Sequence, residues 1–443
     1  MIDAAGPRLR DGEWSSWART ARARPKRVAL PRDEEEVAAL VAAATRERER
    51  VKAVGAGHSW SDAACTSGVL VSLDRMRRLC GLDAETGDVT VEAGMRLSEL
   101  NAALACRGRA LPVLGSISEQ SVAGATATGT HGSAPGLGNL AAGVRAMRLV
   151  LASGGVRDLG GARDEPLLLA ARVGLGAFGV ATRLTLRTVP AFDLVEIREP
   201  LPFDAALARV DELRRSEPFV KVWWLPHTPT AMVVRYRPST GSRTFSEAAR
   251  ALDERVLNAR VLAGLLSAGA RWPEAIPSIN RAVASAYFRA GETVGPSHRV
   301  LNLAMPPRHD ELEYALPVER AADALAYVRD VIERERLRVD FIVELRFSAA
   351  DDAWLSPSFE RDTAWIGAYI AQPRDRARYF DAVEERCLAW GGRPHWGKRF
   401  SASSSALAAR YPRLGDAAAL RREVDPTGTF DNELLARVFG PRT

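Results

Sequence analysis

A glycine-rich loop that ends in a histidine is the stretch of this sequence best suited to chemistry. Residues 54–60 read Val-Gly-Ala-Gly-His-Ser-Trp, and the apolar residues 51–54 lead into them. Glycines let backbone amides approach an anionic group closely and adopt positive φ angles. A histidine at this point can serve as an acid, as a metal ligand or as the point where a cofactor is held covalently. The loop alone leaves these three roles of His58 open.

A second tract is built almost entirely from small residues. Residues 115–133 read G-S-I-S-E-Q-S-V-A-G-A-T-A-T-G-T-H-G-S. The tract has too few large side chains to form a core, yet the apolar segments on either side argue against disorder. Such a composition indicates a backbone that lies close to a large ligand.

A third glycine cluster matches the dinucleotide-binding fingerprint by letter only. Residues 174–179 read G-L-G-A-F-G. The fingerprint works when a helix follows it, because the pyrophosphate sits at the helix N-terminus. Residues 180–187 instead alternate between apolar and polar side chains, which predicts a strand. We therefore expect a glycine turn that enters a strand, not a nicotinamide site, although the backbone of Val180 can still face a cofactor.

Two charged residues alternate on a predicted strand in the second half of the chain. Glu344 and Arg346 lie two positions apart in residues 341–347 (F-I-V-E-L-R-F). Side chains at this spacing project from the same face of a strand. The pattern fits either one side of a pocket or an ion pair on the surface, and the residues alone do not decide between them.

Lysine is rare in this chain. Only four of the 61 basic residues are lysines, namely Lys26, Lys52, Lys221 and Lys398. A coding bias that places arginine wherever a solvated charge suffices explains this rarity. A lysine that survives the bias is a weak indicator of a site that requires a compact ammonium group.

The composition sets the broad class. A length of 443 residues predicts two domains, and 47% hydrophobic with 26% charged residues is typical of a soluble globular protein. The net charge of +6 is spread over interleaved acidic and basic residues, which argues against a nucleic-acid partner. The first eight residues lack a hydrophobic signal core, and no apolar run approaches the roughly 18 residues of a membrane helix. We expect a cytoplasmic protein with no membrane partner.

The cysteines and histidines show no metal-binding pattern. Neither C-x-x-C pairs nor zinc-like spacings with histidine occur, and no carboxylate or histidine stands at ligand spacing on a predicted helix. We therefore expect no metal site and four reduced, mostly buried thiols at Cys65, Cys80, Cys106 and Cys387.

Periodicity and capping signals predict the elements that position these residues. Helices are expected at residues 31–50, 97–107 and 319–335. Strands are expected at residues 51–54, 68–73, 89–94, 144–151, 180–188, 221–225 and 341–347.

Taken together, the G-x-G-H-S loop, the small-residue tract and a late H-W-G-K sequence closely resemble one family. They resemble the vanillyl-alcohol-oxidase-type flavoproteins, and within them the sugar-lactone and alditol oxidase branch. The likeness runs through residues 14–18, 51–62, 115–133, 173–189, 344–347, 351–357 and 393–398. It implies an α+β, two-domain FAD-binding fold of the vanillyl-alcohol-oxidase (PCMH) type with an α+β substrate (cap) domain. The expected division is a FAD-binding domain at 1–190, a cap domain at 191–392 and a C-terminal segment at 393–443 that returns to the flavin site.

The resemblance also assigns roles to individual residues. It implies that His58 carries FAD through a covalent bond, whose electron-withdrawing character raises the flavin's redox potential. It implies that His131 is structural or adjacent to the cofactor, not a catalytic base. The positions that match cofactor contacts in the family are Val54, Gly55, Ala56, Gly57, His58, Ser59, Gly115, Ser116, Ser121, Gly124, Thr128, Gly129, Thr130, His131 and Val180.

On the substrate side the resemblance implies catalytic roles for Glu344, Arg346 and Lys398, with Ser116 also contacting substrate. A cation such as Lys398 near the flavin would stabilise the negative charge that develops on reduction. The other three lysines are expected on the solvated surface. Gly115 favours an oxidase, because alanine at this position accompanies dehydrogenase behaviour in the branch.

The implied activity is oxidation of a carbinol of an aldono-1,4-lactone of the gulono, galactono or arabinono type, with hydride transfer to flavin and O₂ as the expected acceptor. Residues 365–370 hold no histidine, unlike the corresponding strand of alditol oxidases, and residues 351–363 are closer to the lactone oxidases. The alternatives are an alditol oxidase acting on a polyol such as xylitol or sorbitol, or a specialised-metabolism alcohol oxidase. A flavin-binding protein without turnover and a metal-dependent hydrolase fit the sequence less well.

Overall fold

The N-terminal part of the chain forms two main sheets and two short ones among its described residues. The computed structural model describes residues 9–160, 165–303 and 305–442, so the N-terminal residues 1–8 considered above lie outside it. A parallel sheet has the order β4 (Arg27–Ala29), β6 (Val69–Ser72), β5 (Val51–Val54). An antiparallel sheet has the order β11 (Val156–Leu159), β10 (Val144–Val150), β12 (Val180–Leu186), β8 (Val89–Glu92), β7 (Leu79–Leu82). The two short sheets are β1 (Leu9–Arg10), β2 (Glu13–Ser15), β3 (Arg22–Ala23) and β9 (Arg109–Ala110), β13 (Val189–Pro190).

Helix α1 (Glu34–Arg46) covers one side of the hydrophobic core in this part. It is shorter than the predicted 31–50, because Asp33 caps its first turn and Arg48 adopts a left-handed φ of 55° beyond its end. Its apolar residues Val37, Val41 and Ala44 are buried against the core. The other helices of this part are α2 (Leu97–Ala105), α3 (Val122–Ala127) and α4 (Glu165–Ala171).

An eight-stranded antiparallel sheet forms the second part of the molecule. Its order is β17 (Gly291–Pro296), β14 (Asp193–Pro202), β16 (Thr230–Ser239), β15 (Phe219–Trp224), β19 (Val343–Ser348), β20 (Thr363–Ile370), β18 (Asp310–Pro317), β21 (Arg393–Pro394). Helices α5 (Phe203–Ala208), α6 (Val210–Ser216), α11 (Ala321–Arg334) and α12 (Arg376–Ala389) pack against it. Strands β19 and β20 are buried along their whole length, which means that both faces of the sheet are covered there.

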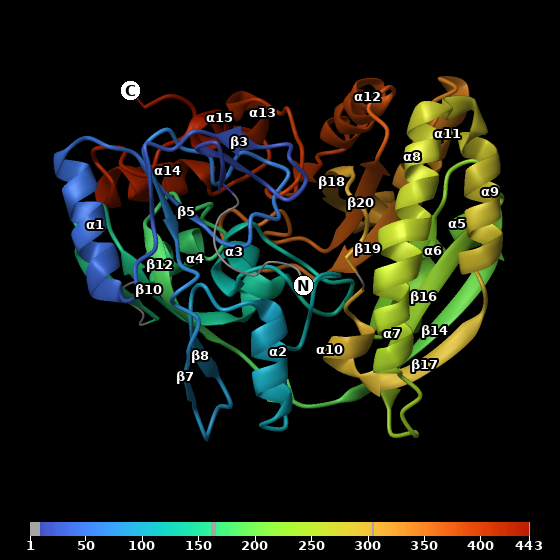
Figure 1. Cartoon of the computed structure of the whole chain (residues 1–443), viewed down its shortest axis with the longest axis horizontal. Helices are drawn as coiled ribbons and strands as arrows, with labels where there is room; N and C mark the ends of the chain where they lie inside the picture. Colours follow the sequence, from blue (N-terminus) through green and yellow to red (C-terminus); the bar gives the residue numbers. More distant parts are fainter. Residues whose placement is uncertain (1–8, 161–164, 304, 443) are drawn as a thin grey trace.

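A helical layer lies on the outside of this sheet in Figure 1. Helix α7 (Glu247–Leu252) continues through a π-helical stretch (Asp253–Leu262) into α8 (Ala263–Arg271), and α9 (Ile276–Tyr287) runs beside α8. The short α10 (Ser297–Val300) follows β17. No helix of the described residues is both long and apolar enough to cross a bilayer.

The C-terminal helices return to the N-terminal part of the chain. These are α13 (Ser404–Ala408), α14 (Leu414–Val424) and α15 (Glu433–Phe439), drawn in red at the upper left of Figure 1. Several hydrogen bonds fix the return. Among them, Val51 N donates to Thr429 O (2.7 Å), and Asn432 Nδ2 donates to Asp62 O (3.0 Å).

The prediction of mostly buried thiols is wrong for two of the four cysteines. Cys80 is exposed because it lies on β7, the edge strand of its sheet, and Cys106 is exposed because it ends α2 on the solvent side. Cys65 is half-buried, and only Cys387 is fully buried.

Candidate active site

A first cavity, open to solvent on one side, lies between the glycine loops of the N-terminal part. The predicted cofactor residues that line it are Val54, Gly55, Ala56, Gly57, His58, Ser59, Ser121, Gly124 and Thr128. Most of the remaining lining residues are glycines and alanines, so the backbone forms most of its wall. Helix α3 begins beside it, where Ser121 Oγ accepts from Gly124 N (3.2 Å).

The donors of this cavity suit a dinucleotide such as FAD. Within the described residues, the backbone N–H groups of Ala56, Gly57 and Ser59 donate to no carbonyl or side chain. These three residues are only partly buried, and they line the cavity with amides that no described protein group engages. Successive free amides in a turn form a good cradle for phosphate oxygens. Asp74 and His58 are the ionisable side chains of the lining, so a pyrophosphate here would be held by backbone groups and not by arginine or lysine.

The glycine turn at residues 174–179 forms another wall of the first cavity, and it enters strand β12 as predicted. The strand that follows the turn argues only against a pyrophosphate bound at a helix N-terminus. It leaves the turn free to line the cavity with its backbone. Lys52 stabilises the turn by donating to Leu175 O (3.1 Å) and Phe430 O (3.5 Å).

The predicted solvated surface position of Lys52 is therefore wrong. The side chain is 2% exposed, and burial lowers its pKa to about 8. The physical reason is that β5 lies between the glycine turn and the C-terminal segment, which leaves no solvent-facing side to this strand.

A second cavity adjoins the first, and the two linings share His58, Ser59, Gln120 and Thr128. His58 therefore stands at the junction, with its ring 5.9 Å from that of Trp17. The other predicted residues of this lining are Gly115, Ser116, Thr130, His131, Glu344, Arg346 and Lys398. Gly129 and Val180 line neither cavity, although Gly179 and Ala181 line the first.

Glu344 and Arg346 project from β19 into the second cavity, as their alternation predicts. Both side chains are buried, which excludes an ion pair on the surface. Glu344 Oε2 lies 3.3 Å from Arg346 Nε and accepts from the Tyr369 hydroxyl (2.8 Å). Glu344 Oε1 accepts from Trp223 Nε1 (2.7 Å). The carboxylate thus accepts two hydrogen bonds and forms an ion pair with Arg346.

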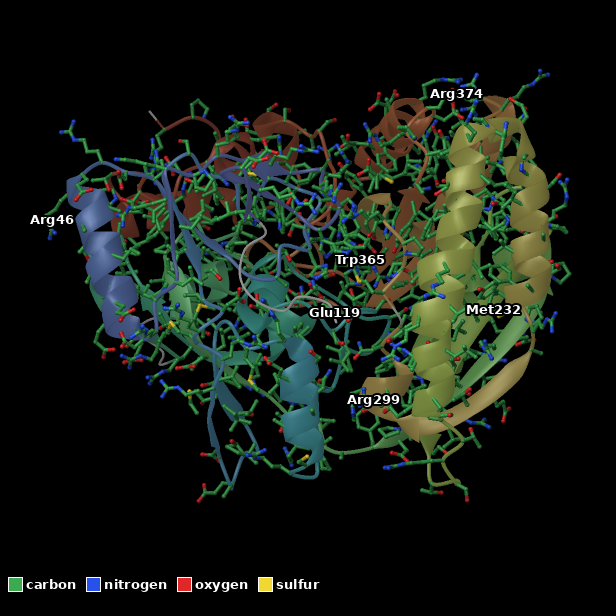
Figure 2. All side chains as sticks on the ribbon, in the orientation of Figure 1. Arg46, Glu119, Met232, Arg299, Trp365 and Arg374 are labelled. Carbon is green, nitrogen blue, oxygen red and sulfur yellow. The ribbon has the colours of Figure 1, made fainter. Side chains whose placement is uncertain are left out.

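His131 lies near Arg346 and is buried. Its Nδ1 donates to Gly132 O (2.9 Å), and its Nε2 lies 3.3 Å from Glu313 Oε1. Its ring stacks on Trp365 with the centroids 3.7 Å apart, near the centre of the molecule (Figure 2). Burial and the nearby Arg346 charge lower the pKa of His131. These contacts suit a structural residue next to the cofactor better than a base.

His131, Glu313 and His395 bring their potential ligand atoms within 4.8 Å of one another. The hydrogen bonds of this cluster oppose a metal ion, however. His395 Nδ1 accepts from Gly397 N (3.0 Å), so the proton of the neutral ring is on Nε2, the atom that would have to bind the ion. Arg346, which donates to Glu313 Oε1 (2.5 Å), already supplies the positive charge.

Lys398 reaches the second cavity from the loop after β21. Its ammonium pairs with Glu311 and lies 4.0 Å from the centre of the Trp60 ring. Backbone bonds hold this loop against the histidine loop, since Trp60 N donates to Gly397 O (2.7 Å). Lys398 is therefore held close to the junction of the two cavities.

Of the other lysines, Lys26 is exposed as predicted, but Lys221 is not. Lys221 is 4% exposed and lies 4.4 Å from the centre of the Trp223 ring, behind the wall of the second cavity. Burial lowers its pKa. The error arises because strand β15 is central in its sheet, so its charged side chain has no route to solvent.

Gly115 and Ser116 are fixed by a segment that precedes β18. Asn302 Nδ2 donates to Gly115 O (2.8 Å), and Leu303 N donates to Ser116 O (2.7 Å). A side chain on Gly115 would begin 2.9 Å from Thr130 Cγ2, so the position has little spare room.

Several residues of the second cavity were missed from sequence. They are Trp17, Gln120, Trp223, His309, Glu311, Phe341, Tyr369 and His395, with Glu313 directly behind them. The available signal was the run D-E-L-E-Y at residues 310–314, in which two acids stand at alternate positions of an apolar strand. This is the spacing that identified Glu344 and Arg346.

Family comparisons agree with this geometry. Residues 184–438 match the model of the D-arabinono-1,4-lactone oxidase family, and residues 25–160 match that of the FAD binding domain. The chain is 36% identical to the L-gulono-1,4-lactone dehydrogenase of Mycobacterium tuberculosis, over 97% of this chain and 99% of the relative. It is 32% identical to the L-gulonolactone oxidase of Bos taurus (96% and 98% covered). It is 33% identical to the alditol oxidase of a Streptomyces species (95% and 97% covered).

Among solved structures, a solvent-stable cholesterol oxidase superposes with a TM-score of 0.83 over 98% of this chain and 100% of that chain, at 18% identity. This likeness establishes the predicted α+β FAD-binding fold. Together with the family matches, it shows that the chain belongs to the D-arabinono-1,4-lactone oxidase family of FAD-dependent oxidoreductases.

Proposed function

We propose that this protein oxidises a carbinol carbon of an aldono-1,4-lactone at the second cavity. The single observation that carries the proposal is that Glu344, Arg346 and Lys398 surround one space whose wall includes His58 and adjoins the cofactor cavity. The relatives named above include enzymes of gulonolactone, which supports a substrate of this class.

Each charged residue of the second cavity has its own role in this proposal. FAD, when bound, accepts a hydride from the substrate carbon. The cations of Arg346 and Lys398 attract the hydroxyl oxygen and stabilise negative charge that develops there. Glu344 fixes Arg346 by an ion pair, and Ser116 offers a further hydrogen bond to the substrate.

We further propose that His58 holds the flavin covalently, since it stands where the two cavities meet. The division into a FAD-binding domain at 1–190, a cap domain at 191–392 and a returning segment at 393–443 belongs to the same proposal. O₂ is the proposed acceptor, because Gly115 leaves the cavity wall without a side chain at this point. An alditol oxidase is the second candidate, supported by the Streptomyces relative.

Anaerobic flavin bleaching tests the substrate. The purified protein would be mixed with gulono-, galactono- and arabinono-1,4-lactones and, separately, with xylitol and sorbitol. Faster bleaching by a lactone supports the main proposal, and faster bleaching by a polyol supports the second candidate. A flavin that none of them bleaches would overturn both.

Acid precipitation tests the attachment. Flavin is expected to stay with the precipitated wild-type chain and to appear in the supernatant of His58→Ala. Free flavin from the wild type would remove the covalent role of His58 without affecting the substrate proposal.

A further inference from the structure

We propose that Tyr369 is a further catalytic residue, which takes the proton of the substrate hydroxyl while passing its own proton to Glu344. This inference rests on the proposed function, because it concerns the same oxidation. Oxidation of a carbinol releases a hydride from carbon and a proton from oxygen, and the proton needs an acceptor within hydrogen-bond reach.

Glu344 is poorly placed to take that proton directly. Its Oε1 accepts from Trp223 Nε1 (2.7 Å), and its Oε2 accepts from Tyr369 (2.8 Å) and faces Arg346 Nε at 3.3 Å. Each oxygen thus already accepts one hydrogen bond, and the Arg346 charge lies beside Oε2. A phenol that donates its single proton keeps lone pairs that can accept another. The Tyr369 oxygen can therefore connect a substrate hydroxyl to a carboxylate that is otherwise enclosed.

The fold supports this position of Tyr369 on the cavity wall. The ring packs against Phe341 (centroids 5.9 Å apart, interplanar angle 14°) and His309 (5.4 Å). Gly367, two residues earlier on β20, makes room for it, since a side chain there would begin 2.8 Å from Tyr369 Cε2. Glu344 is the register partner of Gly367 on the neighbouring strand. Because Gly367 has no side chain, the Tyr369 hydroxyl can contact the Glu344 carboxylate there.

The step balances as follows. The C–H bond breaks with its electron pair, which passes to FAD, and the O–H bond breaks as its proton moves to the Tyr369 oxygen. The Tyr369 proton moves to Glu344 Oε2, and the substrate becomes a carbonyl compound. Burial and the charges of Glu311 and Glu344 raise the pKa of Tyr369 well above 10, so the residue transmits a proton without resting as an anion.

The test is anaerobic stopped-flow reduction of the flavin-loaded Tyr369→Phe enzyme by the lactone or polyol that best bleaches the wild type. Phenylalanine keeps the ring packing and removes only the hydroxyl. We expect the limiting reduction rate to fall by about 10²–10⁴-fold, with little change in substrate dissociation constant. In mixtures of H₂O and D₂O, we expect the wild-type reduction rate to fall with deuterium fraction along a curve, because two protons move in one step. The Tyr369→Phe enzyme should not show this curved dependence.

Tyr314→Phe is the matched control, because Tyr314 also donates to a buried carboxylate, that of Glu384, but lies outside the cavity. It should reduce at the wild-type rate. Gly367→Ala displaces the Tyr369 ring without removing a polar atom, so it should slow flavin reduction on its own. The double variant should reduce at nearly the same rate as Tyr369→Phe alone, because both changes act on the same hydroxyl.

Wild-type reduction rates in Tyr369→Phe, or a loss of affinity alone, would overturn the relay and leave the proposed function standing. If no lactone or polyol reduces the wild type, the proposed function fails and the relay fails with it.

Discussion

Arg346 donates from Nη2 to Glu313 Oε1 over 2.5 Å, although the two residues come from strands that are separated by β20. Both Glu313 and Glu344 are register partners of Gly367 on that middle strand. Arg346 is thus held between two carboxylates, one on each side of a residue without a side chain. The resulting cluster links three strands at the floor of the second cavity.

Glu313→Gln tests the strength of this cluster. Removing one charge of a buried pair leaves the other poorly compensated, so we expect the free energy of unfolding to fall by about 3 kcal/mol. Urea denaturation of the flavin-loaded protein measures it. Glu199→Gln is the control, since Glu199 pairs with Arg235 in a partly exposed position and should cost less than about 1 kcal/mol. Equal losses in the two variants would contradict a special contribution of Glu313.

Lys398→Met tests the ammonium near the junction of the cavities. Without this charge, flavin reduction is expected to slow by about 10²–10³-fold, because the developing negative charge loses a fixed partner. Lys398→Arg should restore little, since a planar guanidinium does not match a compact ammonium over the Trp60 ring. Lys26→Met removes an exposed lysine and should leave the rate unchanged. A Lys398→Met enzyme as fast as the wild type would remove this residue from the mechanism.

Gly115→Ala tests access of oxygen to the flavin. The added methyl group would crowd Thr130 Cγ2 at 2.9 Å. We expect reoxidation of the reduced flavin by O₂ to slow roughly tenfold, or about 1.4 kcal/mol in the barrier, while anaerobic reduction is retained. Gly143→Ala is the control, because no atom lies within 4 Å of the position of its added carbon. Slowed reduction with normal reoxidation would show that Gly115 serves the substrate instead.

His395 predicts a pH dependence of stability. Burial lowers its pKa from 6.5 to about 3, so between these values the unfolded chain binds more protons than the folded one. The stability that comes from keeping His395 neutral is fully present above pH 6.5 and is lost as the pH falls toward 3. At pH 5 the free energy of unfolding is lower by about 2 kcal/mol for this reason. His395→Asn keeps an acceptor for the Gly397 amide and should flatten the change in unfolding free energy between pH 7 and 5. An unchanged slope in this variant would refute the assignment.

Short-range signals in the sequence predicted several local elements of the two cavities well. The strand before the G-A-G-H-S loop, the loop itself and the i, i+2 relation of Glu344 and Arg346 depend only on neighbouring residues, and the structure confirms them. The contacts of His131 could not be predicted, because Glu313 and Trp365 reach it from distant strands whose order depends on the whole sheet.

The errors on Lys52 and Lys221 have one physical cause. Both were expected in solvent because a charge is costly to bury, yet each lies on a strand that is covered on both faces. Lys52 offsets part of that cost through two carbonyl acceptors. Burial of a lysine depends on how many layers cover its strand, and local sequence does not contain that information.

The shared wall of the two cavities has a consequence for how this family diversifies. The linings have only His58, Ser59, Gln120 and Thr128 in common, and the cofactor side is formed mainly by main-chain groups. No residue of β18, β19 or β20 lines the first cavity, so substitutions on these strands change the second cavity and leave the glycine loops of the first as they are. The proposed choice of alcohol can therefore vary within a constant backbone cradle.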